Sequence, residues 1–122
     1  MSYMNYEGLS KKLNRMFDDL RIKPQALEEM EKSLRCHRNN VRRSEILIER
    51  YKYRCDLLES LLNKLPLDEK KIMLERNAHP RMKPTFYAER AHMPLARYEK
   101  KAKEASKKLA DMLAEVPGWE EL

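Results

Sequence analysis

The stretch YAERAHMPLARYEKKAKEASKKL, residues 87–109, decides the fold of this chain. Apolar residues recur at helical spacing in its second half and predict one buried helix face, made of Tyr98, Ala102, Ala105 and Leu109. Ala88 and Met93 stand where a helix-turn-helix needs a small residue at the helix crossing and an apolar residue in its turn. The stretch therefore predicts a helix-turn-helix whose second helix runs from about Leu95 to Ala114.

The composition favours helix along the whole chain. The 122 residues include only two glycines and six prolines, and 38% of them are charged. A chain of this length buries one modest core, which favours a single compact domain. Because the composition favours helix, we expect an all-α protein without a sheet. No apolar run is long enough to span a bilayer, and the first twenty residues lack the layout of a signal peptide. We therefore expect a cytoplasmic protein without a membrane partner.

The N-terminal half predicts two helical segments separated by Pro24. Residues 9–20 place apolar side chains on one face and predict a short helix that ends before Pro24. The next stretch, up to Lys64, contains no Gly or Pro and predicts a helix of roughly forty residues, about 60 Å long. Its apolar stripe is similar to a coiled-coil seam, which favours a homodimer through residues 27–65. The alternative is two helices that break near Asn39-Asn40 and pack on each other.

Shorter elements follow. Residues 67–76 predict a helix with acidic residues in its first turn, and residues 77–84 predict a loop. Thr85 is expected to cap the next short helix, residues 86–91. Trp119, in the tail, either folds back onto the body or lies free. The chain thus divides into an N-terminal helical segment (1–64), a helix-turn-helix domain (65–114) and a C-terminal tail (115–122).

The motif LPLDEKKIMLER, residues 65–76, is followed by YAERAHMPLARYEKKAKEASKKL, residues 87–109. With these motifs, residues 65–113 resemble region 4 of bacterial sigma factors. They also resemble the ArpU/RinA-type phage regulators, which attach a region-4-like C-terminus to a different helical N-terminus and act on late phage transcription. The chain departs from the usual pattern at Ala91 and Ser106, where Leu is usual, at His92, where Gly with a positive φ is common, and at Pro94, where a capping Ser is usual. The matching residues are Leu65, Pro66, Glu69, Lys70, Ile72 and Arg76, then Ala88, Glu89 and Arg90, then Arg97, Ala105, Lys108 and Leu109.

This resemblance implies a sequence-specific regulator of phage or prophage transcription, acting on late genes. Its partners would be double-stranded DNA and host RNA polymerase. A net charge of +6 agrees with a polyanionic partner. In such a regulator the base edges would face Leu95, Ala96, Arg97, Lys100 and Lys101, while Arg81, Lys83, Lys103 and Lys107 would contact phosphates.

Two other functions stay open at this point. The departures at His92 and Pro94 suit a phage-encoded interaction module that keeps the helical packing but binds a host protein, such as RNA polymerase, a sigma factor or a defence protein. A small terminase-like DNA-packaging subunit would also join a helix-turn-helix to helical segments. The basic cluster of Lys32, Arg35, Arg38, Arg42 and Arg43 either flanks DNA or pairs with nearby glutamates.

Nothing in the sequence indicates an enzyme. It lacks a nucleophile-and-base arrangement, a Gly-rich phosphate loop, a paired-carboxylate signature and a cofactor motif. Adjacent side chains such as Cys36 and His37 diverge by about 100° on a helix, and no second pair stands at ligand spacing, so we expect no metal. Cys36 and Cys55 would lie roughly 28 Å apart on one helix at about 1.5 Å per residue, which predicts reduced thiols.

Overall fold

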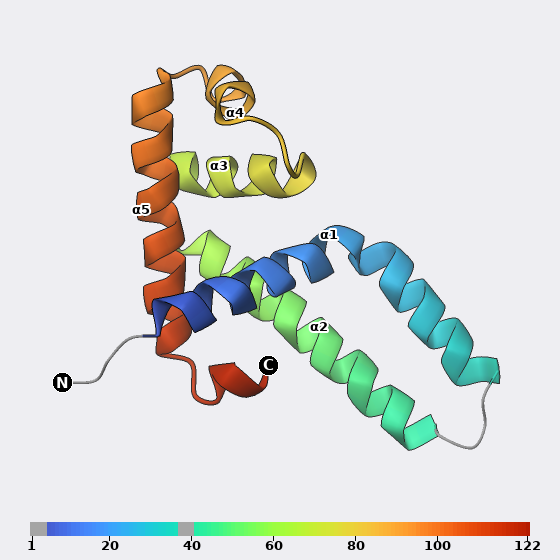
Figure 1. Ribbon diagram of the computed structural model, residues 1–122. Helices are drawn as coiled ribbons and strands as arrows, with labels where there is room; N and C mark the ends of the chain where they lie inside the picture. The colour runs from blue at the N-terminus through green and yellow to red at the C-terminus, as the bar shows by residue number, and fades with distance from the viewer. Residues whose placement is uncertain (1–4, 37–40) are drawn as a thin grey trace.

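The computed structural model describes residues 5–36 and 41–122, and these residues form helices, turns and loops without a strand. The prediction of an all-α protein is confirmed. The helices are α1 (Tyr6–Cys36), α2 (Val41–Asn63), α3 (Leu67–Ala78), α4 (Pro84–Arg90) and α5 (Leu95–Ala114), followed by the 3₁₀ helix η2 (Trp119–Glu121). In Figure 1, the antiparallel pair α1 and α2 crosses the lower part of α5, while α3 and α4 lie beside its upper part.

α1 does not end before Pro24 as the sequence predicted. It continues to Cys36 with Pro24 inside it, and the helix bends about halfway along its length (Figure 1). A proline removes one backbone hydrogen bond and bends the helix, but packing against a neighbouring helix can outweigh that loss. Here α2 supplies the packing, because Arg54 and Tyr51 of α2 bond to the side chain and main-chain carbonyl of Asp19, respectively.

The prediction of one long helix from Pro24 to Lys64 is wrong, and the alternative of two helices packed on each other is confirmed. The break itself, which the sequence placed near Asn39-Asn40, lies outside the described residues. The apolar stripe is buried within the chain from Ile48 to Leu65, so the seam that the predicted homodimer required is covered by the chain's own helices. Pairing within a chain avoids the entropy lost when two molecules associate, which explains why the stripe finds its partner in α1.

A single core joins the two ends of the chain. Leu9 and Met16 from α1, Leu58 from α2, and Leu109 and Leu113 from α5 belong to one cluster and are each at most 1% exposed. Residues on both sides of the predicted boundary at residue 64 therefore share this core. The C-terminal tail also folds back, because Trp119 packs against the cluster and Lys12 Nζ donates to the main-chain oxygens of Glu120 and Leu122 at 3.2 and 2.6 Å.

The C-terminal helices lie close to the positions predicted from the sequence, but the predicted cap of α4 is wrong. α3 extends two residues beyond the predicted 67–76 and α4 begins at Pro84, so the predicted loop 77–84 is shortened to 79–83. α5 has the predicted bounds. The prediction that Thr85 caps α4 is wrong, because Pro84 is already the first helical residue and Lys83 occupies the capping position without a side-chain cap. Proline is well suited to this first position, since its missing N–H would have no partner there.

Candidate nucleic-acid interface

The buried face of α5 is the one that the sequence predicted. Tyr98, Ala102, Ala105 and Leu109 are exposed by 6% or less. The two alanines are small enough to allow close packing of α3 and α4 against α5, and the Tyr98 ring stacks on Tyr87 of α4 with ring centroids 6.1 Å apart. This packing fixes the rotation of α5, so that its opposite face points to solvent.

The turn before α5 has the geometry of a Schellman motif. The N–H of Met93 donates to the carbonyl of Ala88 at 3.1 Å, and the N–H of His92 donates to the carbonyl of Glu89 at 3.1 Å. His92 itself has a φ of 55°, a positive value of the kind that the glycine common at this position adopts readily. Met93 then packs against the core, as the apolar residue of the turn was expected to do.

α5 begins without a side-chain cap. Pro94 is its N-cap residue, with φ −59° and ψ 148°, and the first turn contains no acidic side chain. The first N–H groups of a helix have no partner within the helix and carry a partial positive charge. The start of α5 therefore offers a positively polarised helix end in addition to its basic side chains.

The structure leaves most of the predicted DNA-contacting side chains exposed. On α5, Ala96, Arg97 and Lys100 are exposed, and Leu95 is 39% exposed. Lys101 differs, since its ammonium pairs with the carboxylate of Asp68 on α3 and its side chain is only 25% exposed. That hydrogen bond lowers the pKa of Asp68. The four side chains predicted to meet phosphates are all exposed, namely Arg81, Lys83, Lys103 and Lys107.

Sequence reasoning missed the pairs that join α3 to α5. Lys108 Nζ lies 2.9 Å from both carboxylate oxygens of Glu69, whose side chain is 5% exposed. Glu69 stands three and four residues before Ile72 and Met73, which are also buried, so helical spacing alone could have placed it on the buried face. The pairing of Lys101 with Asp68 has no comparable signal in the sequence.

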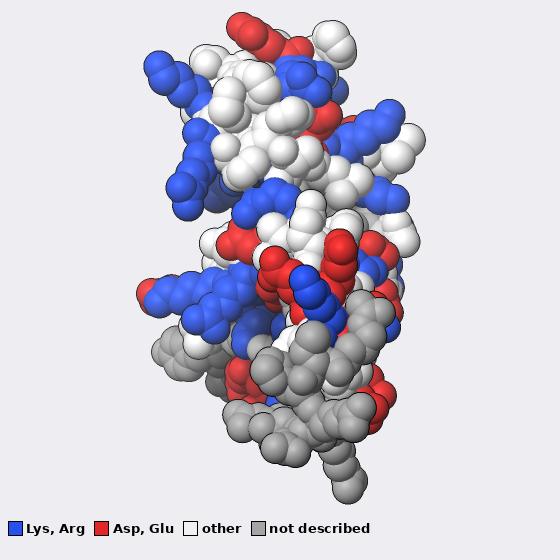
Figure 2. All heavy atoms as spheres, turned by 90° about the vertical axis from the view of Figure 1, so that its right-hand side faces the viewer, with Lys and Arg blue, Asp and Glu red and all other residues white. Residues whose placement is uncertain are grey.

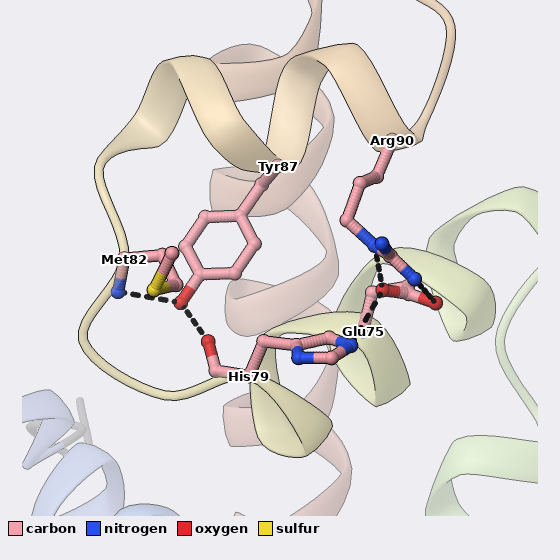
Figure 3. A network of polar contacts seen from close by, with 5 residues as sticks. All are labelled: Glu75, His79, Met82, Tyr87 and Arg90. Atoms are coloured by element: carbon pink, nitrogen blue, oxygen red, sulfur yellow. Dashed lines mark hydrogen bonds and ion pairs between the residues drawn. The ribbon is translucent and has the colours of Figure 1, made fainter.

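A polar network holds the loop between α3 and α4 (Figure 3). The hydroxyl of Tyr87 donates to the carbonyl of His79 and accepts the N–H of Met82 at 3.1 Å. Arg90 Nε donates to the carboxylate of Glu75 at 2.6 Å, and this bond lowers the pKa of Glu75 and raises that of Arg90. Arg90 thus joins α4 to the C-terminal half of α3, and Tyr87 joins α4 to the loop between them.

Other candidate sites find little support. No cluster of three or more His, Cys, Asp and Glu side chains within residues 5–36 and 41–122 could hold a metal ion. Cys55 is a buried free thiol whose pKa is raised by burial, which disfavours the reactive thiolate. Lys32 of the predicted basic cluster is exposed on α1, whereas the side chains of its four arginines lie outside the described residues. None of the described helices is both long enough and apolar enough to cross a membrane.

Comparison of the chain with models of protein families, with curated proteins and with solved structures finds no match.

Proposed function

We propose that this chain is a sequence-specific DNA-binding regulator of transcription that reads the major groove with the first two turns of α5. The observation that carries the proposal is the two-sided character of this helix. Arg97 and Lys100 are exposed, whereas the opposite face is anchored by Tyr98 and the alanines that follow it. A helix fixed in this way presents the same side chains to every duplex that it meets.

The chemistry of the exposed face suits base recognition. A helix with side chains about 10–12 Å wide fits the roughly 12 Å major groove. The guanidinium of Arg97 has the fork geometry that recognises O6 and N7 of guanine, and the uncapped helix start attracts a backbone phosphate. Glu99 and Glu104 are also exposed on this helix and would repel phosphates, so base recognition is assigned to Arg97 and Lys100 and not to the whole exposed face.

The biological setting of the proposal comes from the resemblance to the ArpU/RinA-type regulators. It makes the protein a phage or prophage regulator of late genes that acts in the cytoplasm on double-stranded DNA. The positive φ at His92 and the Schellman turn support this reading, because they provide the turn geometry that a glycine would otherwise allow. Pro94 removes a capping side chain, but α5 still begins one residue later.

The proposal is tested by selecting preferred sequences from a random duplex library and measuring their binding by fluorescence anisotropy. The wild-type chain should bind the enriched duplex at least tenfold more tightly than a shuffled one. Exchanging both Arg97 and Lys100 for Glu should abolish this preference. Exchanging Arg50 and Lys52, two exposed cations of α2, for Glu is the matched control and should preserve it. Equal binding of enriched and shuffled duplexes by the wild type would refute sequence-specific recognition.

A second candidate function, a host-protein-binding module, is favoured by a groove of about 630 Å³ beside the turn. Its apolar lining includes Ile72, Leu74 and Met93, and Leu74 is 38% exposed. Such a groove could accept an apolar side chain of host RNA polymerase or a sigma factor. Exchanging Leu74 for Asp should then weaken binding to purified polymerase holoenzyme, whereas exchanging Leu67, which is 66% exposed and outside the groove, should not.

A further inference from the structure

A polar cleft of about 520 Å³ lies between α1, α3 and the loop that follows α3. Its walls come from parts of the chain that are far apart in sequence. α1 contributes Asn14 and Arg21, α3 contributes Arg76 and Asn77, and the loop contributes Arg81. We call it the α1–α3 cleft. The resemblance implied a phosphate contact at Arg81, but no sequence pattern brought Arg81 together with Arg21 and Arg76, which meet only when α1 folds across α3.

The cleft is positively charged. Three arginines line it, and the acidic residue that lines it, Asp18, already accepts a hydrogen bond from Arg21 at 3.1 Å. Arg76 and Arg81 are exposed, and among the described residues no carboxylate lies within ion-pair distance of either. Two guanidinium groups are thus left without a counter-charge. Guanidinium groups bind phosphate through paired hydrogen bonds, and the amides of Asn14 and Asn77 add further donors.

Two hydrogen bonds hold the main chain on either side of Arg81. Arg81 has a φ of 64°, in the left-handed region that a residue with a side chain rarely adopts. The hydroxyl of Tyr87 bonds to His79 on one side of Arg81 and to Met82 on the other, as Figure 3 shows. The main chain that carries this arginine is therefore locked before any ligand arrives, which reduces the entropy lost on binding.

The cleft continues toward α5. A neighbouring hollow of about 320 Å³ shares Arg76 with the cleft and adds Lys103 of α5, together with one carboxylate, that of Glu99. A basic band therefore runs from Lys103 through Arg76 to Arg81 and Arg21. Figure 2 shows Lys and Arg side chains on both the upper and the lower part of one face of the molecule, with Asp and Glu side chains between and around them.

We propose that the α1–α3 cleft binds phosphates of the DNA backbone next to the groove that α5 reads, so that Arg21 of the N-terminal helix takes part in DNA binding. This inference rests on the function proposed above. Carboxylates of an acidic polypeptide would also suit arginine, but the band begins at Lys103, on the same helix as Arg97 and Lys100, which favours one continuous duplex as the ligand.

The test measures the affinity of the wild type and of three variants of the full chain for one random duplex over a range of salt concentrations. The cleft variant carries Arg21→Gln, Arg76→Gln and Arg81→Asn, the last because asparagine tolerates a positive φ. The control variant removes three exposed cations outside the cleft, through Arg15→Gln, Arg50→Gln and Lys52→Gln. The third form, Arg97→Glu with Lys100→Glu, tests the reading helix separately. Circular dichroism verifies that all forms fold.

Each lost phosphate contact should reduce the slope of log affinity against log salt by about 0.9. We expect the cleft variant to lose two to three units of slope and the control variant less than one. If the cleft variant behaves like the control while the reading-helix variant loses binding, the cleft inference is overturned and the proposed function stands. If only the cleft variant weakens, the cleft binds phosphate and the proposed reading helix is wrong.

Two further results would also decide the matter. A wild-type chain that binds no duplex even at low salt would overturn both proposals. A polyglutamate peptide that binds as tightly as duplex of equal charge, and is lost in the cleft variant, would identify the cleft as a site for acidic polypeptides and overturn the phosphate assignment.

Discussion

The ammonium group of Lys108 lies 2.9 Å from both carboxylate oxygens of Glu69, and the Glu69 side chain is 5% exposed whereas that of Lys108 is 49% exposed. This ion pair joins the first turn of α3 to the C-terminal half of α5, next to the apolar core. A buried carboxylate that loses its partner is costly, because no other charge compensates its desolvation. The position of the proposed reading helix therefore depends on an ion pair as well as on apolar packing.

Exchanging Lys108 for Met should lower the free energy of unfolding by about 1–3 kcal/mol, since the carboxylate of Glu69 would lose its charged partner. Adding Glu69→Gln should recover part of this loss, because a neutral amide is less costly to bury. Urea denaturation measures both changes. Lys107→Met, at the exposed neighbouring position, is the control and should change stability by less than about 0.5 kcal/mol. Equal losses for Lys107→Met and Lys108→Met would contradict this account.

Removing the hydroxyl of Tyr87 should loosen the loop between α3 and α4. The Tyr87→Phe variant leaves the carbonyl of His79 and the N–H of Met82 without their partner, which should cost about 1–3 kcal/mol. The amide of Met82 should then exchange with solvent faster, as measured by hydrogen–deuterium exchange. Tyr53→Phe changes a tyrosine that is 52% exposed and serves as the control. Unchanged protection at Met82 would show that the network does not hold the loop.

Tyr51 predicts a specific loss of stability at high pH. Burial raises the pKa of Tyr51 from 10.0 to about 12, and its hydroxyl donates to the main-chain carbonyl of Asp19. Because the folded state keeps the proton that the unfolded state loses from about pH 10, the contribution is complete below pH 10 and disappears as pH rises to about 12. Urea unfolding at pH 9 and pH 11.5 should show a smaller decrease for Tyr51→Phe than for the wild type. Lysines that titrate in the same range affect both forms equally, so parallel decreases would rule out this role.

The sequence was sufficient to predict α5, because the spacing of apolar residues that marks its buried face lies within the helix itself. Tyr98, Ala102 and Ala105 mark the buried face by spacing alone, and the exposure of Arg97 and Lys100 follows from the same periodicity. Pro24 misled the prediction of α1, because the local cost of a proline was treated as decisive. Packing on α2 proved stronger, and such packing is invisible to a reading of neighbouring residues.

Periodicity identifies an apolar face but not the surface that covers it. The stripe that includes Ile48 and Leu58 was expected to meet a second chain, and it meets α1 of its own chain. The pairs Lys101–Asp68 and Lys108–Glu69 join residues 33 and 39 positions apart, and the α1–α3 cleft gathers arginines from three elements. These two ion pairs and the cleft depend on the tertiary fold, so no pattern of neighbouring residues predicts them.

The turn residue His92 offers a last test of how this chain departs from its expected pattern. His92 has a φ of 55° and an exposed side chain, so the conformation is strained and few contacts would be lost by removing the imidazole. His92→Gly should raise the free energy of unfolding by about 0.5–1 kcal/mol, because relief of strain exceeds the added entropy of the unfolded chain. His92→Val should lower it, since a β-branched residue tolerates a positive φ poorly. Urea denaturation of both variants checks the order, and a glycine variant less stable than the wild type would show that the imidazole makes a stabilising contact in the turn.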